Sequence, residues 1–151
     1  MIARALFAAV CLGIPAQAAA GCAISASGVA FGTYDMSATS ADDATGTITI
    51  TCSILSGLGG YTIALSPGGG GSYAARRMTS GTATLPYQLY ADPARTQIWG
   101  DGSGGSTRAN SIDVIPLLGG SSTYQLYGRI AARLSPRPGA YSDTIVITVS
   151  Y

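Results

Sequence analysis

Apolar and polar residues alternate along much of this chain, most clearly at its C-terminal end. One row of alternate positions there is largely apolar, and the row between is mostly serine and threonine. The largely apolar row consists of Tyr141, Asp143, Ile145, Ile147, Val149 and Tyr151. A period of two residues is that of a β-strand with one buried face, so the pattern predicts a strand over residues 141–151.

The same alternation recurs upstream. Over residues 46–54, isoleucines and Cys52 occupy one face and threonines the other. Aromatic and β-branched content predicts further strands at 61–65, 87–90, 112–118 and 124–134. Clusters of glycine, serine, proline and aspartate separate these segments, and none keeps the 3.6-residue period of an amphipathic helix. The pattern predicts an all-β fold, an antiparallel β-sandwich.

The first twenty residues have the three parts of a secretory signal peptide. Arg4 gives the charged start, residues 5–14 form an apolar run too short to span a bilayer, and small residues follow at 16–20. We expect residues 1–20 to be removed and residues 21–151 to form one mature domain. No later stretch approaches the roughly 20 apolar residues of a transmembrane helix, so we expect no membrane span in the mature chain.

Charge is sparse and balanced in the mature part. It contains seven arginines and seven aspartates, and the chain has no lysine, glutamate or histidine. A neutral surface exerts no long-range attraction on nucleic acid or anionic lipid, so neither is an expected partner. Low charge also gives little protection against self-association, which suits a protein that assembles.

Two cysteines remain once the signal peptide, with Cys11, is removed. In an oxidising compartment, Cys22 and Cys52 most simply form one disulfide. The alternative is a lipoprotein processing site at Cys22, which would leave Cys52 unpaired. Ala19 stands where such sites usually have a large aliphatic residue, and this disfavours lipidation.

The glycine-rich loops do not form a catalytic or phosphate-binding motif. Ser103 lies among glycines, as a protease nucleophile does, but the chain has no histidine or lysine to take its proton. The glycines at 68–71 are not followed by the Lys-Ser or Lys-Thr of a phosphate loop. We therefore expect no enzyme activity and no catalytic residue.

The sequence also offers no recognisable metal site. Two distant cysteines without histidine do not match a zinc site. Neither the Asp42-Asp43 pair nor Asp101 with Asp113 has the spacing of a calcium loop, and turn aspartates are commonly solvated. We expect no metal and no cofactor.

Large and charged side chains have simple structural explanations. The Arg76-Arg77 pair, near a strand start, is expected at the surface, solvated or paired with an aspartate. Trp99 and the tyrosines would suit a sugar-binding face, but at strand spacing most of them are expected in the core or in cross-strand pairs.

Several motifs occur in order along the mature chain. They are Cys22, then Val-Ala-Phe-Gly-Thr-Tyr-Asp at 29–35, Thr-Ile-Thr-Cys-Ser at 49–53, Arg77-Met78, Leu-Pro-Tyr-Gln-Leu-Tyr-Ala-Asp at 85–92, Arg-Thr-Gln-Ile-Trp-Gly-Asp-Gly at 95–102, Tyr-Gly-Arg-Ile at 127–130, and Gly-Ala-Tyr-Ser-Asp-Thr at 139–144. In this order they resemble the spore coat protein U domain family, which includes subunits of archaic chaperone-usher pili. The resemblance covers essentially the whole mature chain.

The resemblance implies an immunoglobulin-like sandwich that lacks one strand and contains a Cys22–Cys52 disulfide. In such pilins a periplasmic chaperone lends the missing strand, and a neighbouring subunit replaces it in the fibre at the outer-membrane usher. The implied location is therefore the cell surface or an extracellular fibre, reached through the periplasm. The implied function is assembly, without catalysis.

The C-terminal strand is the expected docking edge for the partner strand. Its apolar row of Ile145, Ile147, Val149 and Tyr151 would line the groove that the partner fills. The alternative is that this row belongs to the core of a complete sandwich, because alternation alone is the same in both cases.

The stretch before Cys22 is too short to donate a strand once residues 1–20 are removed. The chain is therefore expected to accept a strand, as a tip or minor subunit. Two alternatives remain open. One is a secreted coat or matrix protein that does not polymerise. The other is an adhesive module that binds a surface or glycan through the loops at 56–60, 68–73 and 100–106.

Overall fold

The structure, a computed structural model, describes residues 21–52, 61–111 and 120–150. The predicted signal peptide, the predicted strand at 112–118 and Tyr151 lie outside these ranges. The strands of the described part are β1 (Cys22–Ser27), β2 (Asp42–Cys52), β3 (Tyr61–Leu65), β4 (Arg77–Ser80), β5 (Ala83–Pro86), β6 (Gln88–Tyr90), β7 (Ala109–Ser111), β8 (Gly120–Ile130) and β9 (Ile147–Ser150). A short 3₁₀ turn spans Gly68–Gly70.

The larger sheet has the strand order β1-β2-β8-β6, and all of its neighbouring strands are antiparallel. Its longest ladder joins β2 to β8, from Asp42 opposite Ile130 to Cys52 opposite Gly120. Because side chains alternate between the two faces of a strand, the isoleucines of β2 enter the core. The threonines between them face outward, where the hydroxyls of Thr49 and Thr123 lie 3.1 Å apart.

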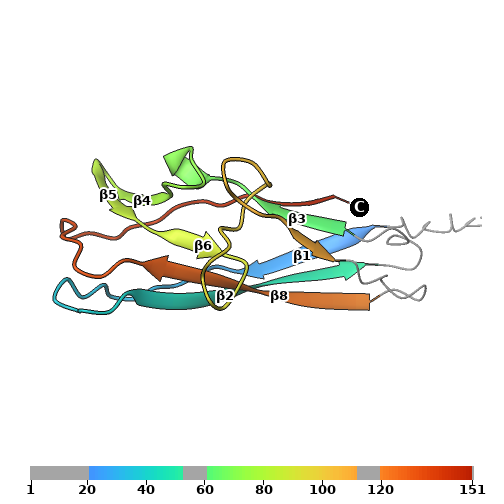
Figure 1. Ribbon diagram of the computed structural model, residues 1–151, viewed down its shortest axis with the longest axis horizontal. Coiled ribbons are helices and arrows are strands. Elements are labelled where there is room, and N and C mark those ends of the chain that lie inside the picture. Colours follow the sequence, from blue (N-terminus) through green and yellow to red (C-terminus); the bar gives the residue numbers. More distant parts are fainter. Residues whose placement is uncertain (1–20, 53–60, 112–119, 151) are drawn as a thin grey trace, which may run out of the picture.

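The second layer consists of a sheet with the order β7-β3-β9 and the β4–β5 hairpin. Figure 1 shows β2 and β8 along one side of the elongated molecule and β3 along the other. This is an antiparallel, immunoglobulin-like β-sandwich, so the prediction of an all-β sandwich is confirmed. No helix in the described part has the length and apolar character needed to cross a membrane.

The core lies between the two layers. Its most buried apolar side chains are Ile48, Ile50, Ile63, Leu65, Trp99 and Ile130. The indole Nε1 of Trp99 donates a hydrogen bond to the Ile63 carbonyl at 3.0 Å. Trp99 is therefore a core residue, as the strand spacing predicts.

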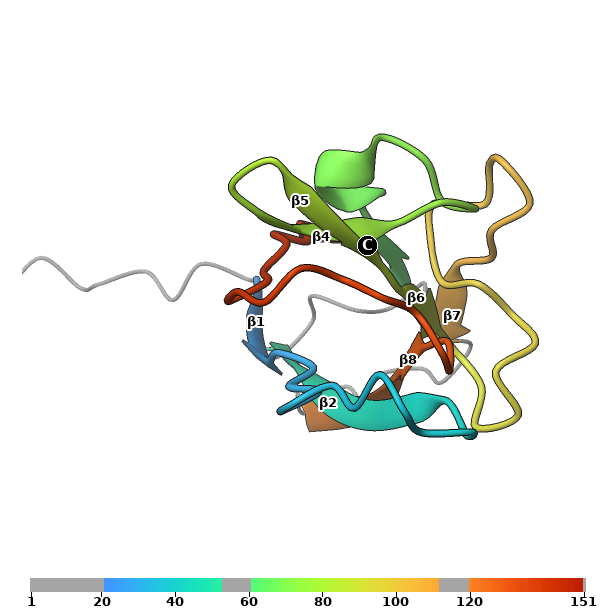
Figure 2. The same cartoon turned by 90° about the vertical axis from the view of Figure 1, so that its left-hand side faces the viewer.

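One long side of the sandwich is closed by the chain that connects β6 to β7, on the opposite side from β1 in Figure 2. This connection bonds to both layers. The amide of Trp99 donates to the carbonyl of Leu89 in β6 at 3.0 Å, and the amide of Leu65 in β3 donates to the carbonyl of Gly100 at 3.2 Å. The two sheets are thus joined through backbone hydrogen bonds along this side.

The C-terminal strand is shorter than the alternation predicts. The pattern covers 141–151, whereas β9 is limited to Ile147–Ser150. Upstream of β9 the chain stays extended but changes partners. Ser142 forms an isolated bridge with Thr79 of β4, and Val146 exchanges hydrogen bonds with Ser66. An alternation of apolar and polar residues does not show which neighbouring segment each residue pairs with, so it cannot reveal such a change of partner.

Arg76 does not lie at the surface, and here the expectation for the Arg76-Arg77 pair is wrong. Arg76 is 1% exposed, whereas Arg77 is exposed. The Arg76 guanidinium donates to the carbonyls of Ser66 (2.9 Å) and Trp99 (2.7 Å) and to Oε1 of Gln88 (2.9 Å). Burial lowers its pKa. Two backbone carbonyls and one amide oxygen, rather than a carboxylate, accept from the buried guanidinium, whose Nε has no hydrogen-bond partner among the described residues.

The disulfide joins the two strands at one edge of the larger sheet. Cys22 begins β1 and Cys52 ends β2, and the register places them directly opposite each other. The expected pairing of Cys22 with Cys52 is therefore present in the structure. β1 is an edge strand that pairs with β2, so the disulfide ties this edge to the sheet covalently.

Candidate functional site

Two strand edges face each other along the side of the molecule opposite the closed one. In the described residues, β9 pairs with β3 along one edge and with no strand along the other. β1 likewise pairs with β2 along one edge only. In a complete seven-strand immunoglobulin sandwich, a further strand lies next to the position that β9 has in its sheet. Within the described residues, the position beyond β9 is therefore without a strand.

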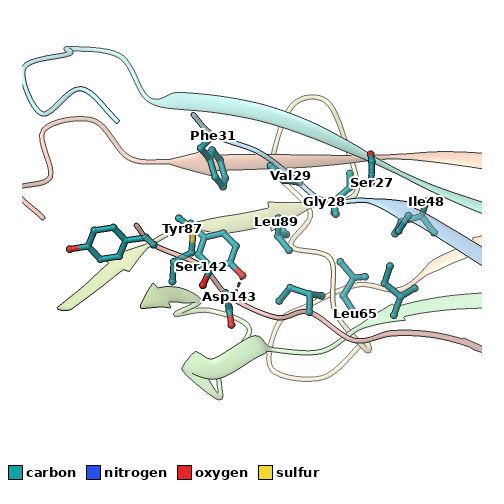
Figure 3. Close-up of a pocket in the computed structure, with 16 residues that line it drawn as sticks. Ser27, Gly28, Val29, Phe31, Ile48, Leu65, Tyr87, Leu89, Ser142 and Asp143 are labelled. Carbon is teal, nitrogen blue, oxygen red and sulfur yellow. Dashed lines mark hydrogen bonds between the residues drawn. The ribbon is translucent and has the colours of Figure 1, made fainter. Parts of the chain in front are cut away.

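A cavity of about 320 Å³ lies between these edges. Its walls come from the end of β1 with the residues that follow it, and from the extended chain at 141–147. Its floor is formed by core residues, namely Ile48, Leu65, Leu89, Leu126 and Tyr87. Figure 3 shows Ile48, Leu65 and Leu89 pointing into this groove, with Val29 and Phe31 on the wall that follows β1. We call this cavity the acceptor groove.

Ile24 is a core-facing residue of β1 that remains exposed in the described part of the chain. It lies opposite Ile50 on β1, in the same inward row as Cys22. Ile50 is 1% exposed, but Ile24 is 43% exposed. An isoleucine on an inward-facing row is normally buried in a sandwich. In the described residues no strand pairs with the outer edge of β1, and this inward-facing side chain is left exposed.

The open edge of the C-terminal chain also presents backbone hydrogen-bonding groups. The amide of Ser66 donates to the carbonyl of Val146 at 2.9 Å, and the register continues with Leu65 opposite Ile147. In an antiparallel ladder, successive residues direct their N–H and C=O groups to opposite edges. Because Val146 faces β3, the backbone groups of Ile145, Ile147 and Val149 are directed to the open edge.

The predicted docking residues occupy this edge as far as the structure describes them. Ile145 and Ile147 line the acceptor groove. Val149, in β9, is partly buried and packs against the core. Tyr151 lies outside the described residues.

The acceptor groove has a polar end that the sequence analysis did not single out. The hydroxyl of Tyr87 donates to Oδ2 of Asp143 at 2.7 Å, the bond drawn as a dashed line in Figure 3. Oδ1 of Asp143 accepts from the amides of Gly69 and Thr144, both at 2.8 Å. Burial, and then the hydrogen bond to the carboxylate, raise the pKa of Tyr87. The signal in the sequence is a charged residue in an otherwise largely apolar row.

A second, larger cavity of about 630 Å³ adjoins the groove. The two share Val29, Phe31, Met78 and Tyr141 in their walls. The second cavity extends to Met36, which is 53% exposed, and to the chain at 136–140. The apolar surface therefore continues past the polar end of the groove.

The remaining sequence candidates have local structural roles in the described residues. Ser103 donates its hydroxyl to Oδ1 of Asp101 at 2.6 Å and its amide to the same atom at 2.9 Å. This is a turn stabilised by an aspartate side chain. No group of three or more His, Cys, Asp or Glu suited to a metal ion occurs within the ranges 21–52, 61–111 and 120–150.

The described residues thus form an immunoglobulin-like β-sandwich in which no strand lies beyond β9. The chain belongs to the Spore Coat Protein U domain family, whose model matches residues 8–148. This match confirms the resemblance that the motifs carry. The comparison with curated proteins found no match.

A solved structure with a similar fold is the chaperone–tip adhesion subunit pre-assembly complex from the archaic chaperone-usher Csu pili of Acinetobacter baumannii. The sequences are 24% identical and the TM-score is 0.59. The match covers 87% of this chain but 39% of the chain it matches. At this identity, the likeness establishes a shared fold.

Proposed function

We propose that this protein is a non-enzymatic structural subunit of a bacterial surface fibre of the archaic chaperone-usher type. It accepts a β-strand from another protein, which completes its sandwich. The observation that carries this proposal is the acceptor groove between the outer edges of β1 and β9, whose apolar walls include residues that are only partly buried, such as Ile145 and Ile147. Membership of the Spore Coat Protein U domain family supports it.

The partner strand pairs with the open edge at Ile145, Ile147, Val149 and Tyr151. Free N–H and C=O groups on a strand edge template a further strand, and alternate side chains of the added strand enter the groove. A periplasmic chaperone supplies this strand first, and a neighbouring subunit replaces it at the outer-membrane usher. The Csu pilus complex, with its similar fold, is a chaperone bound to a subunit, and this supports the first step.

Export and position in the fibre complete the proposal. Residues 1–20 direct the chain to the periplasm, and residues 21–151 form the domain that is assembled at the cell surface. Within the fibre the protein is a tip or minor subunit, because the stretch between this signal peptide and Cys22 is too short to supply a strand of its own.

The test is expression of the whole chain in the periplasm, with and without an archaic-type pilus chaperone. Size-exclusion chromatography of the soluble fraction then shows whether the two proteins form a stoichiometric complex. We expect a complex with the chaperone and aggregation or degradation without it. A stable monomer in both conditions would overturn the proposal and favour a secreted coat or matrix protein.

A matched pair of variants locates the interaction. Ile147→Asp places a charge in the acceptor groove, whereas Val146→Asp places the same charge on the outer face, where Val146 is already 60% exposed. We expect Ile147→Asp to abolish complex formation and Val146→Asp to retain it. Equal behaviour of the two variants would show that the chaperone binds elsewhere.

A further inference from the structure

One charged residue stands in the core-facing row of the C-terminal chain. Asp143 follows the same alternation as Ile145 and Ile147, and all three line the acceptor groove. Among the described residues that line the groove, it is the one that carries a formal charge. A strand that pairs with this edge will therefore place one side chain beside a carboxylate and its other inward side chains beside apolar residues.

The carboxylate is held in place by three donors but is not saturated. The amides of Gly69 and Thr144 bond to Oδ1, and the Tyr87 hydroxyl bonds to Oδ2. An ionised carboxylate offers about four acceptor positions, and the Tyr87 oxygen can itself accept a bond. Acceptor capacity thus remains at the polar end of the groove, on the side where a partner strand would lie.

Alternation alone does not determine the register of an added strand. A shift by one residue turns every apolar side chain out of the groove and is strongly disfavoured. A shift by two residues, however, keeps all of them inside. An apolar groove of uniform character would therefore accept several registers of the same alternating strand, and a different kind of position is needed to select one.

We propose that Asp143 selects the register of the donated strand by requiring a hydrogen-bond donor at the position that faces it. This inference rests on the proposed strand-accepting function and adds the chemistry of the partner. The donated strand has apolar residues facing Ile145, Ile147 and Val149 and a serine, threonine or other donor facing Asp143. Cross-strand neighbours on one face have Cβ atoms about 5 Å apart, which is within reach of such a bond.

A strand displaced by two residues meets a penalty at this position. It covers the carboxylate with an apolar side chain, which removes water without replacing its hydrogen bonds. We expect binding in that register to be weaker by about tenfold or more. An aspartate on the partner is disfavoured by a similar factor, because it brings a second acceptor and a like charge.

Capped peptides of the sequence X-Thr-Val-Thr-Val-Thr-Val-Thr-X test this, with X as Ser, Val or Asp. The repeated X makes the design independent of strand direction. The oxidised, processed protein is refolded with each peptide, the affinity is measured, and hydrogen exchange reports protection of the amides of Ile145, Ile147 and Val149. We expect the Ser peptide to bind about tenfold tighter than the Val or Asp peptide.

The variant Asp143→Asn distinguishes between two roles of Asp143, namely selecting the register of the donated strand and stabilising the local structure. Its Oδ1 can still accept from Gly69 and Thr144, while its Nδ2 can donate to the Tyr87 oxygen. The polar end then presents a donor. The Asp and Val peptides should bind the wild type about equally weakly, but we expect this variant to bind the Asp peptide more tightly than the Val peptide. A purely structural role would weaken all three peptides alike. Tyr87→Phe keeps the carboxylate and should keep the preference for Ser.

The outcomes distinguish this proposal from the one on which it rests. If the peptides protect the three amides but bind equally well, Asp143 does not select the register, although strand acceptance is supported. If no peptide protects them, the strand-accepting function itself is wrong. Co-expression of Asp143→Asn with an archaic-type chaperone shows which donated strand hydrogen-bonds to Asp143. If the complex is lost, the chaperone strand makes this contact as well as a subunit extension. If the complex is unchanged, only a subunit extension makes it.

Discussion

The two long sides of the sandwich are built differently. On the closed side, the connection between β6 and β7 bonds to both layers, and Trp99 and Arg76 are each 1% exposed. On the open side, β1 and β9 each lack a strand neighbour in the described residues, and Ile24 on an inward-facing row is 43% exposed. On the closed side, backbone hydrogen bonds within the chain join the two layers. On the open side, the outer edges of β1 and β9 have no strand to pair with in the described residues.

This difference indicates how one small domain can be both folded and incomplete. A strand edge and an uncovered groove reduce stability, so the rest of the molecule has to compensate. The buried network around Arg76 ties Ser66, Trp99 and Gln88 together, and Ser66 in turn fixes Val146 at the wall of the groove. Through Ser66, the buried network around Arg76 thereby holds the C-terminal chain in place at the wall of the acceptor groove.

Replacement of Arg76 should have the largest effect. Arg76→Met leaves the carbonyls of Ser66 and Trp99 without the guanidinium donor, whereas Oε1 of Gln88 still accepts from the amide of Leu89. Each buried acceptor left without a donor costs about 1–3 kcal/mol, and the packing of the Arg76 side chain is lost as well, so we expect the variant to be largely unfolded. Urea denaturation followed by circular dichroism measures this. Arg77→Met, at the exposed neighbouring position, is the control and should change stability by less than about 0.5 kcal/mol.

Removal of the disulfide should come next. Replacing Cys22 and Cys52 by serine frees a loop with a sequence separation of 30, and the chain-entropy model gives a loss of about 3–4 kcal/mol. Because β1 is an edge strand, it should be the first element to lose protection in hydrogen exchange. If β1 and β8 lost protection equally, β1 would not be the less stable of the two strands, and this prediction would be wrong.

A groove residue should matter less to the free protein than a core residue of the same type. Ile63 is fully buried, and Ile63→Ala should cost about 2–5 kcal/mol. Ile145 is only partly buried, so Ile145→Ala should cost about 1 kcal/mol in the free protein. With a partner strand bound, Ile145 becomes a core residue, and the cost should rise. Denaturation of the free protein and of the complex, compared for both variants, measures the difference.

The smallest effect is expected at Asp43, on the outer face of the larger sheet, where it pairs with Arg129 of β8 and with Arg95 of the β6–β7 connection. The bidentate hydrogen bonds from Arg129, at 2.7 and 2.8 Å, lower the pKa of Asp43. A lowered folded-state pKa stabilises the protein above the unfolded pKa of about 3.9, and this is lost as the pH falls through the folded value. Both side chains are partly exposed, so the contribution should be about 0.5 kcal/mol.

Stability measured as a function of pH for the wild type and Asp43→Asn tests that assignment. The two proteins should differ slightly at neutral pH and converge in acid. A difference that grows as the pH falls would have the wrong sign for a stabilised carboxylate.

The sequence predicts the strands best where one partner accompanies a segment along its whole length. The predicted strand at 61–65 agrees with β3, and the alternation at 46–54 identifies the inward row of β2. The C-terminal prediction is too long because residues 142 and 146 bond to different neighbours, and alternation carries no information about the partner.

The sequence predicts only part of the acceptor groove. The apolar row of Ile145 and Ile147 predicts the wall, but the same row would occur in a complete sandwich. Arg76 is missed because its partners are backbone carbonyls, which have no signature in the sequence. Asp143 is visible as an exception in the pattern, yet its role depends on Tyr87 and Gly69, which are distant along the chain.

The position of the disulfide has a mechanical consequence. Tension applied at the N-terminal end of the domain first reaches Cys22, where the covalent bond passes it directly to Cys52 at the end of β2. β2 is anchored along its length by β8. The load therefore bypasses the ladder between β1 and β2, and the exposed edge strand is not peeled from the sheet when the chain is pulled.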